Sequence, residues 1–68
     1  MKPLWQGEKL RVRRKQLGLT TAELADKTGC DRQLVSMWEN DKAAPSGHFL
    51  IVLSIVLNVN PKNFYTFE

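Results

Sequence analysis

The sequence predicts an all-α fold, a compact bundle of about five short helices. Three observations lead to this fold class. Turn-forming residues divide the chain into short segments, at Gly18, Gly29, residues 41–45 and residues 58–61. Each segment after the first opens with a residue that can cap a helix. The apolar run at residues 49–57 is the one candidate strand, and a single strand has nothing to pair with.

The first two helices are marked by their ends. The first is expected over about residues 6–17, with Gly18 ending it in a left-handed conformation. The second opens at Thr20, whose hydroxyl can accept a hydrogen bond from the backbone N–H of Glu23 while the Glu23 carboxylate reaches back. Gly29 ends this second helix after barely two turns.

Three more helices are expected from similar signals. Asp31 can cap a third helix over residues 32–39. Ser46 can cap a fourth helix that runs to about residue 57, and Asn60 can cap a fifth whose first position is proline. We therefore interpret the apolar run within the fourth segment as a helix.

Size and composition limit the function. The chain of 68 residues, 43% apolar and 25% charged, is expected to form one domain over residues 1–68. Its core would be marginal, and a second chain would stabilise it. One cysteine, Cys30, and one histidine, His48, exclude an internal disulfide and an ordinary Cys/His metal cluster. We expect no metal, no cofactor and no enzymatic activity, because no nucleophile–base pair or glycine-rich phosphate loop is present.

The positive charge is concentrated near the N-terminus. The net charge is +3, and residues 1–17 hold six basic residues against one acidic residue, Glu8, while residues 18–68 hold four against six. A basic patch suits nucleic acid, although a solvated helix face is the commoner explanation of a charge run. There is no apolar signal core, and no apolar run approaches the roughly 20 residues of a membrane span, so we expect a cytoplasmic protein without a membrane partner.

The spacing of apolar residues predicts a helix-turn-helix within about residues 20–40. Ala25 is small where the third helix crosses the second, and Gly29 takes the turn. Val35 and Trp38 then hold the third helix against the first two. The opposite face of the third helix is left to contact another molecule, and it carries Arg32, Gln33, Ser36 and Met37.

A larger set of residues stands at spacings that are typical of one family: Gly7, Glu8, Lys9, Leu10, Arg11, Arg14, Gly18, Leu19, Thr20, Glu23, Leu24, Ala25, Gly29, Val35, Glu39, Pro45, Leu57 and Val59. In these positions the chain resembles the helix-turn-helix domains of lambdoid-phage repressors and Cro proteins, also called the xenobiotic-response-element family. The resemblance implies a lambda-repressor-like bundle that binds duplex DNA, commonly as a dimer on a two-fold operator.

The resemblance also implies roles for individual residues. Base edges would be contacted by Thr21, Arg32, Gln33 and Met37. The DNA backbone would be contacted by Thr20, Asn40 and Lys42, and we expect Ser36, on the outward face of the third helix, to contact it as well. Arg14 and Glu39 match a pair that forms an inward salt bridge. Side-chain chemistry agrees, because arginine can pair with guanine and glutamine with adenine, each for about 1–3 kcal/mol of discrimination.

The segment after the third helix departs from the family pattern. Asp41 stands where glycine is usual, so it must adopt a left-handed conformation or change the turn, and it brings a negative charge near the expected phosphate. Ala43 and Ala44 follow where basic residues are common. We therefore expect Lys9 and Arg13 of the first helix to contact phosphates, with Arg13 alternatively extending along the edge of the core.

The fourth helix is apolar on two sides, and a single small domain can bury only one of them. The surplus is expected to form a self-association surface that consists of Ile51, Val52 and Ile55, with Tyr65 and Phe67 near the C-terminus. A homodimer would present two third helices about 34 Å apart, one turn of DNA. A different protein, such as a toxin or an RNA polymerase subunit, is the alternative occupant.

The sequence therefore predicts a sequence-specific transcriptional regulator of double-stranded DNA, a small bacterial or phage repressor that binds a two-fold operator as a dimer. Two alternatives stay open. The same fold serves antitoxins and the controller proteins of restriction–modification systems. It could also serve as a protein-interaction module that has lost DNA binding, which the charge of Asp41 and the weakly charged recognition segment allow.

Overall fold

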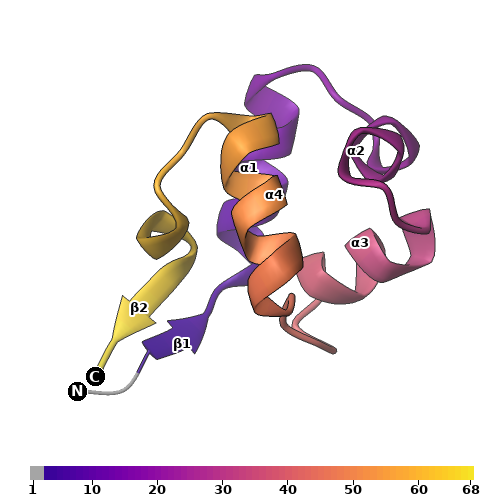
Figure 1. The fold of residues 1–68 in the computed structure, drawn as a ribbon. Helices are drawn as coiled ribbons and strands as arrows, with labels where there is room; N and C mark the ends of the chain where they lie inside the picture. Colours follow the sequence, from indigo (N-terminus) through magenta and orange to yellow (C-terminus); the bar gives the residue numbers. More distant parts are fainter. Residues whose placement is uncertain (1–2) are drawn as a thin grey trace.

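The structure is a computed structural model that describes residues 3–68, so the first two residues of the expected 1–68 domain lie outside the described part. Its elements are, in order, β1 (Pro3–Trp5), α1 (Gly7–Gln16), α2 (Thr21–Thr28), α3 (Arg32–Glu39), α4 (Gly47–Leu57), the 3-10 helix η1 (Pro61–Phe64) and β2 (Tyr65–Phe67), as Figure 1 shows. The expected bundle of short helices is confirmed, with the fifth helix of the 3-10 type.

Local capping signals define α2 and α3. The Thr20 hydroxyl accepts from the backbone N–H of Glu23 at 3.0 Å, and the Glu23 carboxylate accepts from that of Thr20 at 2.9 Å. Gly29, with φ of 80°, ends α2 in the left-handed region. The Asp31 side chain then accepts from the backbone N–H of Gln33 at 3.0 Å. The two helices therefore meet across one glycine turn.

The start of α4 differs in detail from the expectation, whereas η1 is capped as predicted. Ser46 occupies the N-cap position of α4, but its side chain makes no capping hydrogen bond. At the other end, Asn58 is left-handed with φ of 54°, and Arg13 Nε donates to the carbonyl of Leu57 at 2.9 Å. Asn60 caps η1 through its side-chain oxygen, as expected.

A small antiparallel sheet joins the two ends of the described chain, and the sequence did not predict it. Its register pairs Pro3 with Phe67, Leu4 with Thr66, and Trp5 with Tyr65. Strands of three residues are too short to show an alternating pattern, and their partner lies at the far end of the chain. The run at residues 49–57 is helical, as preferred.

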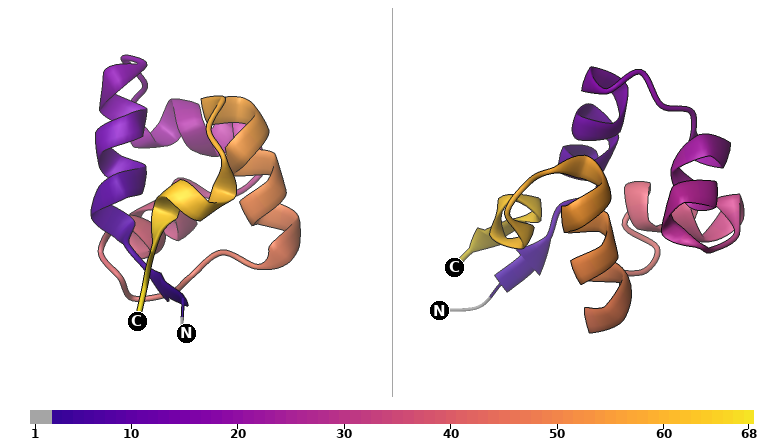
Figure 2. Two further views of the ribbon diagram at one scale, coloured as in Figure 1. Left: turned by 90° about the vertical axis from the view of Figure 1, so that its left-hand side faces the viewer. Right: turned by 45° about the horizontal axis from the view of Figure 1, so that its top comes forward.

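The core lies where the helices converge. Its buried apolar residues are Leu10, Leu24, Ala25, Val35, Trp38, Leu53, Leu57 and Phe64. Helix η1 packs on both α1 and α4, while α2 and α3 pack on each other on the side of the molecule away from the sheet (Figure 2). Among residues 3–68, no helix is long and apolar enough to cross a membrane.

Candidate nucleic-acid interface

The first turn of α3 and the start of α2 form a shallow hollow on the surface. Val35 and Trp38, with 0% and 1% of their surface exposed, hold the inner face of α3 in the core. The opposite face is exposed, and the hollow is lined by Thr21, Asp31, Arg32, Gln33 and Ser36. Three of the four residues expected to contact bases therefore come together, whereas Met37 faces outward beyond the lining of the hollow.

A buried ion pair fixes α3 relative to α1. Arg14 Nε lies 2.6 Å from Glu39 Oε2, and Arg14 Nη2 donates to Glu39 Oε1 at 3.1 Å. A third nitrogen of Arg14 donates to the carbonyl of Leu19 at 2.8 Å. The hydrogen bond to Glu39 raises the pKa of Arg14, although burial opposes the shift. The expected Arg14–Glu39 pair is thus present, and it sets the angle at which α3 leaves the bundle.

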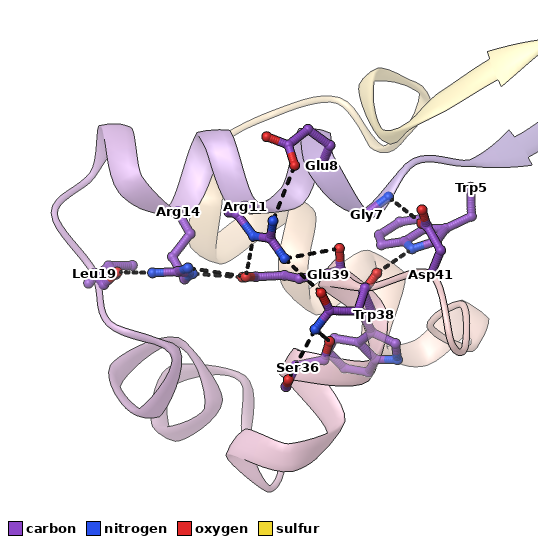
Figure 3. A network of polar contacts seen from close by, with 11 residues as sticks. Trp5, Gly7, Glu8, Arg11, Arg14, Leu19, Ser36, Trp38, Glu39 and Asp41 are labelled. Carbon is purple, nitrogen blue, oxygen red and sulfur yellow. Dashed lines mark hydrogen bonds and ion pairs between the residues drawn. The ribbon is translucent and has the colours of Figure 1, made fainter.

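A second polar network lies at the C-terminal end of α3 and contains Arg11, to which the sequence analysis assigned no role (Figure 3). Arg11 Nη2 donates to Asn40 Oδ1 at 2.9 Å and Arg11 also approaches Glu8 and Glu39, at 3.3 Å and 3.4 Å. Asn40 Nδ2 donates in turn to the carbonyl and hydroxyl oxygens of Ser36, at 2.8 Å and 3.3 Å. The exposed side chain of Asn40 is therefore held in place by Arg11 and Ser36.

Asp41 adopts the left-handed conformation, with φ of 59°, and its carboxylate caps α1. Asp41 Oδ1 accepts from the backbone N–H of Gly7 at 2.8 Å, whereas Gln6, at the N-cap position itself, makes no side-chain capping bond (Figure 3). A carboxylate at a helix N-terminus is favourable. The charge expected near a phosphate is thus directed toward the start of α1.

The start of α1 packs directly on the last turn of α3. A Cβ atom on Gly7 would lie 2.3 Å from the backbone oxygen of Trp38, which no ordinary contact allows. The same oxygen accepts from Trp5 Nε1 at 2.8 Å. Glycine at position 7 and the indole of Trp5 therefore dock the N-terminal segment onto α3.

Comparison with known proteins identifies the family. A helix-turn-helix family model matches residues 10–64. The chain belongs to this helix-turn-helix family. Its curated relatives include repressor protein C2 of Salmonella phage P22, 36% identical over 55 residues that make up 81% of this chain and 26% of the repressor. The chain thus spans about a quarter of the length of that relative.

Solved structures of the family superpose over most of the chain. The phage P22 c2 repressor in complex with a synthetic operator is 33% identical, with a TM-score of 0.85 over 90% of this chain and 92% of that one. The restriction–modification controller C.AhdI of Aeromonas hydrophila is 29% identical, with a TM-score of 0.79 over 85% and 88%. The N-terminal DNA-binding domain of SinR from Bacillus subtilis is 32% identical, with a TM-score of 0.79 over 85% and 86%.

Within this helix-turn-helix fold, Lys9 and Arg13, which were expected at phosphates, both contact backbone carbonyl groups of the C-terminal half of the chain. Lys9 Nζ donates to the carbonyl of Tyr65 at 3.4 Å, and Arg13 Nε donates to that of Leu57 at 2.9 Å. Both side chains therefore turn toward the C-terminal segment, on the side of α1 away from α3. Arg13 follows the alternative expectation and runs along the edge of the core, because the free carbonyl at the end of α4 attracts a cation.

Two other residues expected at the DNA backbone, Thr20 and Lys42, are exposed at the surface. The Thr20 hydroxyl accepts the capping bond at the exposed start of α2. Lys42 is exposed directly after Asp41. Both lie on segments that border α3, at the start of α2 and after the end of α3.

The surplus apolar surface on α4 is present. Ile51 is 59% exposed and Ile55 72%, while Val52 is half-buried. The C-terminal residues of the expected surface lie on a different element, because Tyr65 packs edge-on against Trp5 with ring centroids 5.6 Å apart, and Phe67 follows on β2. Strand β2 extends away from α4 (Figure 1).

Proposed function

We propose that this chain is a sequence-specific DNA-binding domain that regulates transcription, as a small repressor in a bacterial cytoplasm. The observation that carries the proposal is the exposed start of α3, where Arg32 and Gln33 line one hollow with Thr21. In the major groove, Arg32 suits guanine O6 and N7, and Gln33 suits adenine N6 and N7. Met37, beyond the hollow, suits a thymine methyl group.

Backbone contacts would surround these base contacts. We assign them to Thr20, Ser36 and Lys42, and we leave out Lys9 and Arg13, which bind carbonyl groups on the other side of α1. A domain that binds in this way needs no catalytic group or cofactor. Affinity would fall steeply with salt, because each neutralised phosphate releases condensed counterions.

We further propose that the regulator is a homodimer that reads a two-fold operator. The exposed Ile51 and Ile55, with Val52, provide an apolar face on α4 for a second copy. Because Tyr65 is packed on Trp5 and β2 extends away from α4, we assign the surface to α4 alone. Sedimentation tests this: the wild type should dimerise at micromolar concentration, and Ile55→Glu should be monomeric. A wild-type monomer at high micromolar concentration would refute the assignment.

Selection of bound duplexes from a random pool tests the main proposal. The wild-type protein should enrich a sequence with two-fold symmetry. Gln33→Ala should lose its preference at one position of each half-site, whereas Gln16→Ala, a matched change on an exposed glutamine near the end of α1, should keep the full preference. No enrichment of any sequence, or unchanged specificity in Gln33→Ala, would contradict the proposal.

One other function is favoured by a specific observation. The match to the controller C.AhdI makes a controller of a restriction–modification system the second candidate. A neighbouring endonuclease gene, and binding to the promoter of that gene, would identify it. A module without DNA binding is less well supported, because one of its two grounds was the charge of Asp41, and that carboxylate caps α1.

A further inference from the structure

The amide group of Asn40 is committed to contacts within the protein. Its nitrogen carries two hydrogens, and the two contacts of Nδ2 both go to Ser36, at 2.8 Å and 3.3 Å. Its oxygen accepts from Arg11 at 2.9 Å. Because both polar atoms of the Asn40 amide already make hydrogen bonds within the protein, we assign Asn40 as a support for Ser36 and not as a direct contact to the DNA backbone.

Ser36 is the residue on which this network ends. A hydroxyl has one donor and two acceptor sites, and the Oγ of Ser36 already accepts from Asn40. Its hydrogen is therefore directed away from Asn40. Ser36 is exposed and lines the same hollow as Arg32 and Gln33, so a donor at this position faces the surface that we assign to DNA.

Arg11 provides the charge at the other end of the network. Its guanidinium forms ion pairs with the carboxylates of Glu8 and Glu39, which carry the opposite charge. Its shortest hydrogen bond goes to Asn40. Hydrogen bonds in a chain polarise one another, and a charged donor at the head of the chain strengthens the effect. The chain of hydrogen bonds from Arg11 through Asn40 to Ser36 thus makes the Ser36 hydroxyl a stronger hydrogen-bond donor and fixes its direction.

We propose that the Ser36 hydroxyl donates a hydrogen bond to one phosphate of the DNA backbone, and that Asn40 and Arg11 are positioning residues that orient it. The proposal rests on the proposed DNA-binding function, which already places Ser36 at the DNA backbone, and adds the direction of its hydrogen bond and the residues that orient it. It also changes the role expected of Asn40, from a ligand of the phosphate to a support for Ser36.

Methylphosphonate scanning of a duplex tests the proposal. The probe is the duplex that the wild-type protein selects from a random pool, with one phosphate at a time made neutral. At one phosphate per half-site, wild-type affinity should fall about tenfold. Ser36→Ala should bind the unmodified duplex with an affinity about tenfold below that of the wild type, and neutralising that phosphate should not lower its affinity further. Asn40→Ala should also lose sensitivity there, and its effect should not add to that of Ser36→Ala.

Salt dependence separates positioning from direct contact for Arg11. The logarithm of the association constant falls linearly with the logarithm of the salt concentration. If Arg11 neutralised a phosphate, Arg11→Gln would reduce the magnitude of this slope by about 0.9. Positioning predicts an almost unchanged slope, together with reduced methylphosphonate sensitivity at the Ser36 phosphate. Lys42→Gln is the matched control, because this exposed lysine is a direct candidate and its loss should lower the slope. Urea unfolding of each variant shows that it is folded.

Each outcome decides between the two proposals. If Ser36→Ala keeps full methylphosphonate sensitivity at every phosphate, or if Arg11→Gln lowers the slope as Lys42→Gln does, the positioning proposal is wrong while the DNA-binding function stands. If the wild-type protein selects no duplex, the DNA-binding function fails and the positioning proposal fails with it.

Discussion

Replacing Asp41 by alanine is expected to lower the free energy of unfolding by about 2 kcal/mol. The carboxylate of Asp41 accepts from the backbone N–H of Gly7 at 2.8 Å, and an N-cap bond contributes about 1 kcal/mol. Its charge at the N-terminus of α1 contributes about 0.5 kcal/mol more. Alanine loses both contributions and tolerates the φ of 59° less well than aspartate does.

Two further substitutions at this position separate the contributions. Asp41→Asn keeps an oxygen acceptor and the tolerance of a positive φ, so it should cost only about 0.5 kcal/mol. Asp41→Gly loses the cap but relieves about 1 kcal/mol of backbone strain, so it should also lie close to the wild type. The expected order of stability is wild type, then asparagine and glycine together, then alanine.

Urea unfolding followed by circular dichroism measures this order. With a slope of about 1 kcal/mol per molar, Asp41→Ala should unfold at about 2 M less urea than the wild type. Asp26→Ala, an exposed aspartate on α2, is the control and should stay within about 0.5 kcal/mol. The capping argument is refuted if Asp41→Ala matches the wild type, or if Asp41→Asn is as unstable as Asp41→Ala.

Three other predictions concern stability and titration. Glu39→Gln should lower the free energy of unfolding by about 3 kcal/mol, because it leaves the buried guanidinium of Arg14 without its carboxylate; a urea-measured loss below about 1 kcal/mol would contradict this. Thr28→Val should raise the melting temperature, with a gain of about 1 kcal/mol, because the buried hydroxyl of Thr28 has no hydrogen-bond partner among the described residues; a lower melting temperature would count against it. Hydrogen bonds from Thr20 lower the pKa of Glu23, and the bond from the Thr20 backbone contributes more than the bond from its side chain. The stability that this capping box contributes should therefore be present above the ordinary glutamate pKa and be lost as the pH falls through the lower value in the folded protein, and an NMR titration in which Glu23 shows an ordinary pKa would exclude this.

Local signals explain what could be predicted. The cap at Thr20 and its partner Glu23 are three residues apart, so the sequence itself displays the capping box. Gly29 and the buried Val35 and Trp38 define the turn and the inner face of α3 in the same way. The outward face of α3 then follows by exclusion, which is why Arg32, Gln33 and Ser36 could be assigned to one surface.

Contacts between distant segments explain what was missed. The family pattern allows a positive φ at Asp41, but the partner of its carboxylate, Gly7, lies 34 residues earlier. Helix periodicity shows that Lys9 and Arg13 are on the surface of α1, yet it does not show that β2 and the end of α4 lie beside them. The role of Arg11 could not be predicted for the same reason, because its hydrogen-bond partner Asn40 lies at the end of α3.

The pairing of β1 with β2 also has a topological consequence. Pro3 lies opposite Phe67, at the corner of the molecule away from the α3 face (Figure 1). A short peptide linker could therefore close the backbone into a circle without crossing the surface that we assign to DNA. Cyclisation restricts the unfolded chain, and closing a loop of this length removes conformational entropy equivalent to about 4 kcal/mol. A circular form of this domain would then draw much of its stability from connectivity, with the same core and the same α3 face.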